Sequence, residues 1–273
     1  MTDPDRHGPV VVGIDGSRAA VHAAEWATDE AISRDVPLCL VHVTRPVVTA
    51  KSFVDEYNID KEYAQTSLRD AAAAVNATGK PVKVDCVIRH GLASDALAAE
   101  SRTASLVCVG SEGSGRLASV IWGSTATEIA KRAHCPVAIV HRPEFVSHNR
   151  TVWLAVAVNG AQDTDTIIDH AIQEARLRSL PVLAVGTWQE DMGESLYEEL
   201  DRRVACLRER YPDVHIYPVA APADIGRFLA DCDEPIQLAV VGRDDISDVI
   251  HLRPSAERGD RTILIVRVSP RSS

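Results

Sequence analysis

Long apolar runs are absent from this sequence, and so is the pattern of a secretory signal. No segment approaches the ~18 to 20 consecutive apolar residues that a membrane-spanning helix requires. Residues 1–6 (MTDPDR) lack the charged-then-apolar order of a signal peptide. We therefore expect a cytoplasmic protein that does not have a membrane as its partner.

Paired cysteine motifs are also absent. The 6 cysteines are scattered along the chain and include no CxxC pair. Several lie in or beside apolar strand-like segments, where a cysteine usually behaves as a small hydrophobic residue. We predict reduced structural thiols in place of a metal or redox centre.

An excess of positive charge is missing too, since the formal net charge is −10 at pH 7. Such a surface repels phosphate backbones, which argues against nucleic acid as a partner. Backbone N–H groups at the start of a helix can nevertheless bind an anion without any net positive charge. A phosphate site is therefore expected at a helix start.

The sequence contains an internal repeat. Its 273 residues are enough for two domains, and 45% of them are hydrophobic. Four segments recur at similar places in the second half: 11–17 as 155–161, 37–43 as 181–187, 106–110 as 238–242, and 136–140 as 262–266. We predict one duplicated unit, with domains at residues 1–145 and 150–273 joined by the polar stretch 142–150.

Within each half, short runs of Val, Ile and Leu alternate with longer amphipathic segments, which is typical of α/β domains. Helices are predicted at 18–34, with Ser17 as N-cap, and at 95–102 and 125–132. The near-continuous apolar strands indicate a parallel sheet that is covered on both faces. Each half is predicted to be a doubly wound α/β domain with about five parallel strands flanked by helices. Residues 44–66 lack strong periodicity and are predicted to form a lid or lining loop.

Two glycine clusters suggest a phosphate site. Residues 110–116 (GSEGSGR) follow an apolar strand, and Gly123, Ser124 and Thr125 open the next helix. Glycine lets the backbone approach a ligand closely, and the N–H groups of the helix start then point at it. The pattern is neither a Walker A loop nor a GxGxxG fingerprint. It lacks a loop lysine, and no second acidic residue for Mg²⁺ is obvious beside Asp15, which argues against fast phosphate transfer.

Three segments together resemble the ATP-binding branch of the universal stress protein family, in the tandem form found in actinobacteria. They are residues 13–17 (GIDGS), residues 41–43 (VHV) and the spacing Gly110-x2-Gly113-x9-Gly123-Ser124. The resemblance covers nearly the whole chain. It implies a Rossmann-like, adenine-nucleotide alpha-hydrolase-like fold, and ATP as the ligand, which Mg²⁺ could accompany.

The resemblance also implies a role for each residue. Asp15, which follows Gly13 at the first strand end, would bind the ribose or the phosphate end of ATP, and Val43 would offer backbone hydrogen bonds to adenine. The resemblance further implies phosphate and ribose contacts by Gly110, Gly113, Gly123, Ser124 and Thr125. From its position beside the glycines, Arg116 could reach a terminal phosphate.

The second half departs from this pattern. Asn159 and Ala161 stand where Asp15 and Ser17 stand in the first half, and the segment after Gly242 is RDDISD, without a glycine partner. Its aspartates would repel a triphosphate. We therefore expect a single nucleotide, held by the first half.

Each of these interpretations has a structural alternative. Asp15 could serve only to cap the following helix, the glycine loop could be a plain turn, and Arg116 could be a solvated loop cation. His42, His134 and His141 fit packing roles better than a catalytic one.

For function, the leading hypothesis is a nucleotide-dependent stress-response regulator or sensor. The alternatives are a slow ATPase or self-phosphorylating enzyme, and an interaction scaffold. Residues 137–140 and 263–266 would form exposed sheet edges, which we expect to pair within one chain, while a homodimer would use another surface.

Overall fold

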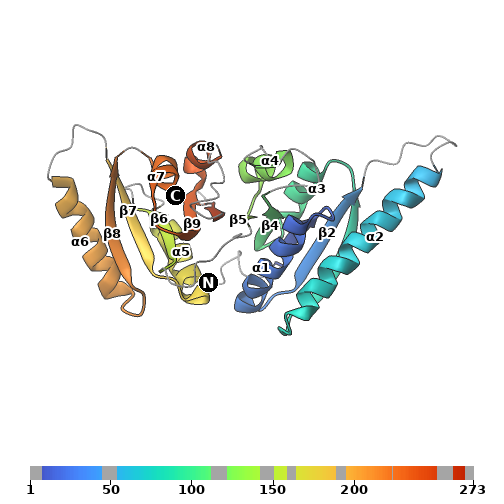
Figure 1. Cartoon of the computed structure of the whole chain (residues 1–273), viewed down its shortest axis with the longest axis horizontal. Coiled ribbons are helices and arrows are strands. Elements are labelled where there is room, and N and C mark those ends of the chain that lie inside the picture. Colours follow the sequence, from blue (N-terminus) through green and yellow to red (C-terminus); the bar gives the residue numbers. More distant parts are fainter. Residues whose placement is uncertain are drawn as a thin grey trace. The chain divides into compact units, whose positions relative to one another are not determined.

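The computed structural model describes residues 8–44, 54–111, 122–141, 151–158, 164–188, 195–222, 224–250 and 261–267. The chain divides into two compact units, Met1–Arg142 and Pro143–Ser273. Each unit is a parallel sheet flanked by helices (Figure 1).

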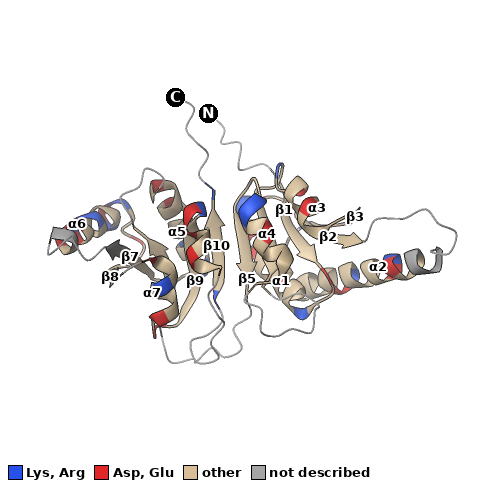
Figure 2. Cartoon of the chain, turned by 90° about the horizontal axis from the view of Figure 1, so that it is seen from above, with Lys and Arg blue, Asp and Glu red and all other residues tan. Residues whose placement is uncertain are grey.

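The first unit contains five strands in the order β3-β2-β1-β4-β5, and every neighbouring pair is parallel. Its elements are β1 (Val10–Ile14), α1 (Arg18–Arg34), β2 (Leu38–Thr44), α2 (Val54–Ala77), β3 (Val84–His90), α3 (Ala93–Glu100), β4 (Leu106–Gly110), α4 (Ser124–Arg132) and β5 (Val137–Val140). In Figure 2, α2 and α3 lie on opposite sides of the strands of this unit. The predicted doubly wound arrangement is therefore confirmed.

The first helix forms where its sequence predicts it. Ser17 is the N-cap, and its hydroxyl accepts a hydrogen bond from the Ala20 N–H at 3.1 Å. A stripe of alanines on α1 is buried: Ala20, Ala23, Ala24, Ala27 and Ala31. Their small side chains let the helix lie close to the sheet. The helix ends at Asp35, whose φ of 54° is left-handed.

The prediction of a loop at residues 44–66 is wrong from Val54 onward, because α2 begins there. Residues 45–53 lie outside the described residues. The buried face of this helix is formed mainly by Ala64, Leu68, Ala71 and Val75, which recur at helical spacing. Most of that stripe lies beyond residue 66, so the segment 44–66 alone does not show it.

The second unit repeats the first. Its strands follow the order β10-β9-β6-β7-β8, all parallel, so β6 and β9 occupy the places of β1 and β4. Its elements are β6 (Trp153–Ala157), α5 (Thr164–Arg178), β7 (Val182–Trp188), α6 (Ser195–Arg210), β8 (Ile216–Pro222), α7 (Ile225–Asp231), β9 (Ile236–Gly242), the 3₁₀ turn η2 (Arg243–Asp245), α8 (Ile246–Val249) and β10 (Thr262–Val266).

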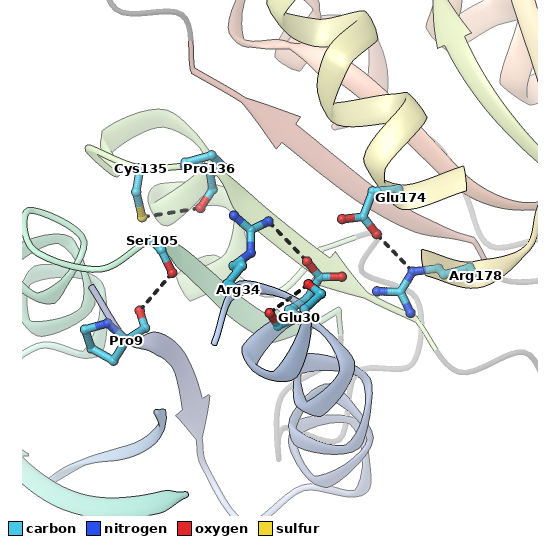
Figure 3. Close-up of polar contacts among 9 residues, drawn as sticks. Pro9, Glu30, Arg34, Ser105, Cys135, Pro136, Glu174 and Arg178 are labelled. Atoms are coloured by element: carbon cyan, nitrogen blue, oxygen red, sulfur yellow. Dashed lines mark hydrogen bonds and ion pairs between the residues drawn. The ribbon is translucent and has the colours of Figure 1, made fainter. Parts of the chain in front are cut away.

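A buried ion pair is repeated as well. In α1 the Arg34 guanidinium donates to Glu30 at 3.1 Å, and in α5 Arg178 donates to Glu174 at 3.0 Å (Figure 3). Both carboxylates are almost fully buried, at 1% and 3% exposure. Buried charges must be paired, so each pair constrains both of its residues at the same position of the repeated helix.

The packing of α7 against α8 leads to a stability prediction. A Cβ atom at Gly226 would lie 2.1 Å from the backbone oxygen of Asp248, which cannot move without shifting α8. We expect Gly226→Ala to destabilise the protein by about 1 to 2 kcal/mol, since overpacking outweighs the better helix propensity of alanine. The urea midpoint of unfolding measures this.

Gly242→Ala is the matched control, because its new methyl group would meet only the ends of side chains, Ile167 Cδ1 at 2.9 Å and Asp245 Oδ2 at 3.2 Å. We expect a smaller loss of stability there. Equal losses in the two variants would contradict the steric explanation.

Candidate functional site

The strand order of the first unit places a topological switch point, where open α/β sheets have their ligand crevice, at the carboxyl ends of β1 and β4. The chain leaves β1 through α1 toward β2, and it leaves β4 through α4 toward β5. The connections diverge there, and open α/β sheets bind ligands at such a switch point. The predicted residues Asp15 and Gly110 both lie at this edge.

Asp15 forms the turn between β1 and α1. Its Oδ1 accepts a hydrogen bond from the Ser17 N–H at 2.9 Å, and the turn passes through Gly16 at a φ of +82°. The Asp15 carboxylate therefore helps to fix the start of α1, which is the capping role that the structural alternative gives it.

Gly13 and Gly110 are explained by packing. A Cβ atom at Gly110 would lie 2.7 Å from the backbone carbon of Ala19, so this glycine lets the end of β4 approach the first turn of α1. A Cβ atom at Gly13 would lie 2.9 Å from Leu97 Cδ1 in α3. Both glycines shape the crevice by bringing its walls together.

Val43 presents its backbone to the first strand. The Pro37 carbonyl accepts from the Val10 N–H of β1 at 3.0 Å, and alternate residues of a strand direct their amide groups to the same neighbour. Val43 therefore faces β1 as well. The pairing of β1 with β2 ends at Ile14 opposite His42. The Val43 carbonyl consequently points past the end of β1, into the crevice.

The start of α4 is held against the end of β4. The Gly123 N–H donates to the Ser111 carbonyl at 3.0 Å, so this amide closes the loop and is already bonded. Gly123 is the N-cap and makes no side-chain capping bond. The N–H groups of Ser124 and Thr125 belong to the first turn, whose amides lack partners within a helix. These amides are the anion donors that the site offers.

Sequence reasoning missed Tyr63, which α2 places at the crevice. Its hydroxyl donates to the Asp15 carbonyl at 3.0 Å, and a Cβ atom at Gly16 would lie 2.4 Å from that hydroxyl oxygen. The residue belongs to the segment predicted to be a lining loop. Tyr63 lies on a helix and not on a loop. The helical spacing of apolar residues, followed beyond residue 66, is the signal that would have placed Tyr63 on a helix.

His42 contacts Tyr63, and their ring centroids are 5.8 Å apart in an edge-on arrangement. Only 6% of His42 is exposed, and its Nδ1 atom has no hydrogen-bond partner among the described residues. Burial lowers the pKa of His42, and the charges of Asp15 and Asp60 oppose that shift only in part. The ring is therefore neutral near pH 7.

The other two histidines singled out in the sequence make local contacts. His141 Nε2 lies 3.4 Å from Ser111 Oγ, and the His134 N–H donates to Ser101 Oγ at 2.9 Å. Neither histidine is paired with a carboxylate in these contacts.

At the corresponding strand end in the second unit, an aspartate caps the backbone. The Gly242 N–H donates to Asp245 Oδ2 at 3.0 Å, directly after β9. Burial raises the pKa of Asp245, the bond from the Gly242 N–H lowers it, and Asp248 and Asp244 raise it. The Asp245 side chain thus already binds the backbone donor at the end of β9. Asn159, Gly160 and Ala161 lie outside the described residues.

Gly113 and Arg116 also lie outside the described residues, within the gap at 112–121. Among the described ranges, no group of three or more His, Cys, Asp or Glu residues could hold a metal ion.

Burial raises the pKa of Cys39 to about 11, so this thiol stays protonated at neutral pH. Within the part of the chain that the structure covers, no helix has the length and apolarity to cross a membrane.

Comparison with known proteins gives consistent matches. A family model described as "Universal stress protein family" matches residues 7–141. A universal stress protein of Mycobacterium tuberculosis is 43% identical over 263 residues, which cover 94% of this chain and 96% of the relative. Another from the same organism is 38% identical over 247 residues, covering 88% and 90%. A solved universal stress protein from Archaeoglobus fulgidus shares the fold, with a TM-score of 0.70 at 13% identity, over 97% of this chain and 98% of its own.

Proposed function

The chain belongs to the universal stress protein family, and on that premise we propose that its first unit binds one ATP molecule as a nucleotide-dependent regulator of a stress response. The phosphates bind at the start of α4. Asp15 binds the ribose or the phosphate end, and the Val43 backbone binds adenine. The proposed site also includes Gly113 and Arg116, and Mg²⁺ could accompany the phosphates.

This proposal is supported by a difference between the two units in the chain that follows the strands β4 and β9. After β4, the first unit has Gly123 as an N-cap that makes no side-chain capping bond. The first-turn amides of a helix are donors that suit an anion. After β9, the second unit has Asp245 bonded to the Gly242 N–H. A triphosphate approaching β9 would meet a carboxylate, whereas at α4 it would meet N–H donors.

The test is to purify the full chain without added nucleotide, release any ligand with acid, and identify it by chromatography. We expect up to one adenine nucleotide per chain. Incubating the complex and following ADP then measures turnover, and adding EDTA tests the need for Mg²⁺. A chain that carries no nucleotide and takes up none when ATP is added would contradict the proposal.

The proposal extends to assembly and location. Taken alone, the first unit has β5 at one edge of its sheet and the second unit has β10, and residues 137–140 and 263–266 of these strands are all apolar. We propose that domains at 1–145 and 150–273 pair through these edges within one chain, and that a homodimer in the cytoplasm uses another surface.

This pairing predicts that residues 1–145, produced alone, self-associate through the freed β5 edge. Light scattering over a range of concentrations measures the mass. A well-folded fragment that stays monomeric at every concentration would contradict the pairing.

A further inference from the structure

Tyr63 is an aromatic residue that is not buried in the hydrophobic core. It is 51% exposed, yet its hydroxyl is bonded to the Asp15 carbonyl at 3.0 Å. The residue therefore reaches from α2 across the end of β2 to the end of β1. This bond fixes one edge of the ring at the crevice while leaving much of the side chain open to solvent.

The helix that carries Tyr63 is well anchored. Its neighbours Ala64, Ser67 and Leu68 are buried, at 0%, 5% and 5% exposure. On the other side, Gly16 leaves room for the phenol, because a Cβ atom there would lie 2.4 Å from the Tyr63 hydroxyl and 2.8 Å from Ser67 Oγ. The ring position is thus set by the fold before any ligand arrives.

The surroundings of Tyr63 suit a flat, polar-edged ligand. Next to the ring, in an edge-on contact, lies His42, whose buried Nδ1 atom has no partner in the described part of the chain. Beside it, the Val43 carbonyl points past the end of β1. A half-exposed aromatic ring that is fixed at the carboxyl end of the strands is a surface on which a base and its ribose can pack.

We propose that Tyr63 is a specificity-determining residue of the site, which packs its ring against the base and ribose of the bound nucleotide. The proposal rests on the proposed function. Stacking on an aromatic side chain strengthens binding by about five- to hundredfold per base. Because a purine offers a larger face than a pyrimidine, Tyr63 favours ATP over CTP.

The test is calorimetric titration of the nucleotide-free full chain and its Tyr63→Ala variant with ATP, CTP and inorganic tripolyphosphate. We expect Tyr63→Ala to weaken ATP binding at least fivefold, to narrow the preference for ATP over CTP, and to leave tripolyphosphate binding within twofold. Tyr63→Phe retains the ring, so it should bind ATP better than Tyr63→Ala does. Tyr197→Ala is the matched control, since Tyr197 is also 51% exposed but lies in α6 of the second unit.

Two results would overturn this role. ATP affinity unchanged in Tyr63→Ala would show that the ring does not touch the nucleotide. Equal losses for ATP and tripolyphosphate would show a general disturbance of the site. A wild-type chain that binds none of the three ligands would instead overturn the proposed function, and this role with it.

Discussion

Gly123→Ala is expected to weaken ATP binding about a hundredfold while the protein stays folded. The backbone at Gly123 has φ −58° and ψ 155°, which alanine adopts without strain. Its N–H bond to the Ser111 carbonyl also survives the substitution. The added methyl group, however, would stand at the helix start where the phosphates approach, and such overpacking costs up to about 3 kcal/mol.

Calorimetry with ATP measures the affinity of Gly123→Ala, and the urea midpoint of unfolding measures its stability. Gly242→Ala in the second unit is the control, and its affinity for ATP should equal that of the wild type. Wild-type affinity in Gly123→Ala would place the nucleotide elsewhere.

Asp15→Ala is expected to weaken ATP binding between about tenfold and 150-fold, the range for losing a hydrogen bond to a charged group. Asp15→Asn retains an oxygen that can accept the Ser17 N–H, so the turn should persist while the charge is lost. We expect its affinity to lie between those of the wild type and Asp15→Ala. The measurement is again the dissociation constant of ATP.

Ser17→Ala distinguishes a ligand role of Asp15 from helix capping. It removes the bond to the Ala20 N–H and should cost about 1 kcal/mol of stability, with ATP affinity changed by less than twofold. If Asp15→Ala behaved in the same way, losing stability but not affinity, the carboxylate would only cap the helix.

Much of the fold could be predicted because its signals are local. Ser17 marks the start of α1 and the alanine stripe marks its buried face, and the repeated apolar strands predicted two similar sheets. The α2 helix was missed because its buried stripe lies mainly after residue 66. The repeated pairs Glu30–Arg34 and Glu174–Arg178 were equally visible in the sequence, but their burial depends on tertiary packing.

The candidate site was predicted less completely than the fold. Spacing in the sequence indicated that Asp15 and Gly110 follow neighbouring strands. It could not indicate that Gly110 accommodates the backbone of Ala19, or that the Gly123 N–H is bonded to Ser111, because these contacts join residues far apart in the chain. Helical periodicity could have placed Tyr63 on α2, but it could not show the bond from Tyr63 to the Asp15 carbonyl, which joins two elements.

The measurement that tests the central claim most directly is the stoichiometry of ATP binding to the full, nucleotide-free chain by isothermal titration calorimetry. A single site per chain is expected, lost in Gly123→Ala and retained in Gly242→Ala. Two sites per chain, or one site that survives Gly123→Ala, would contradict a nucleotide held by the first unit alone.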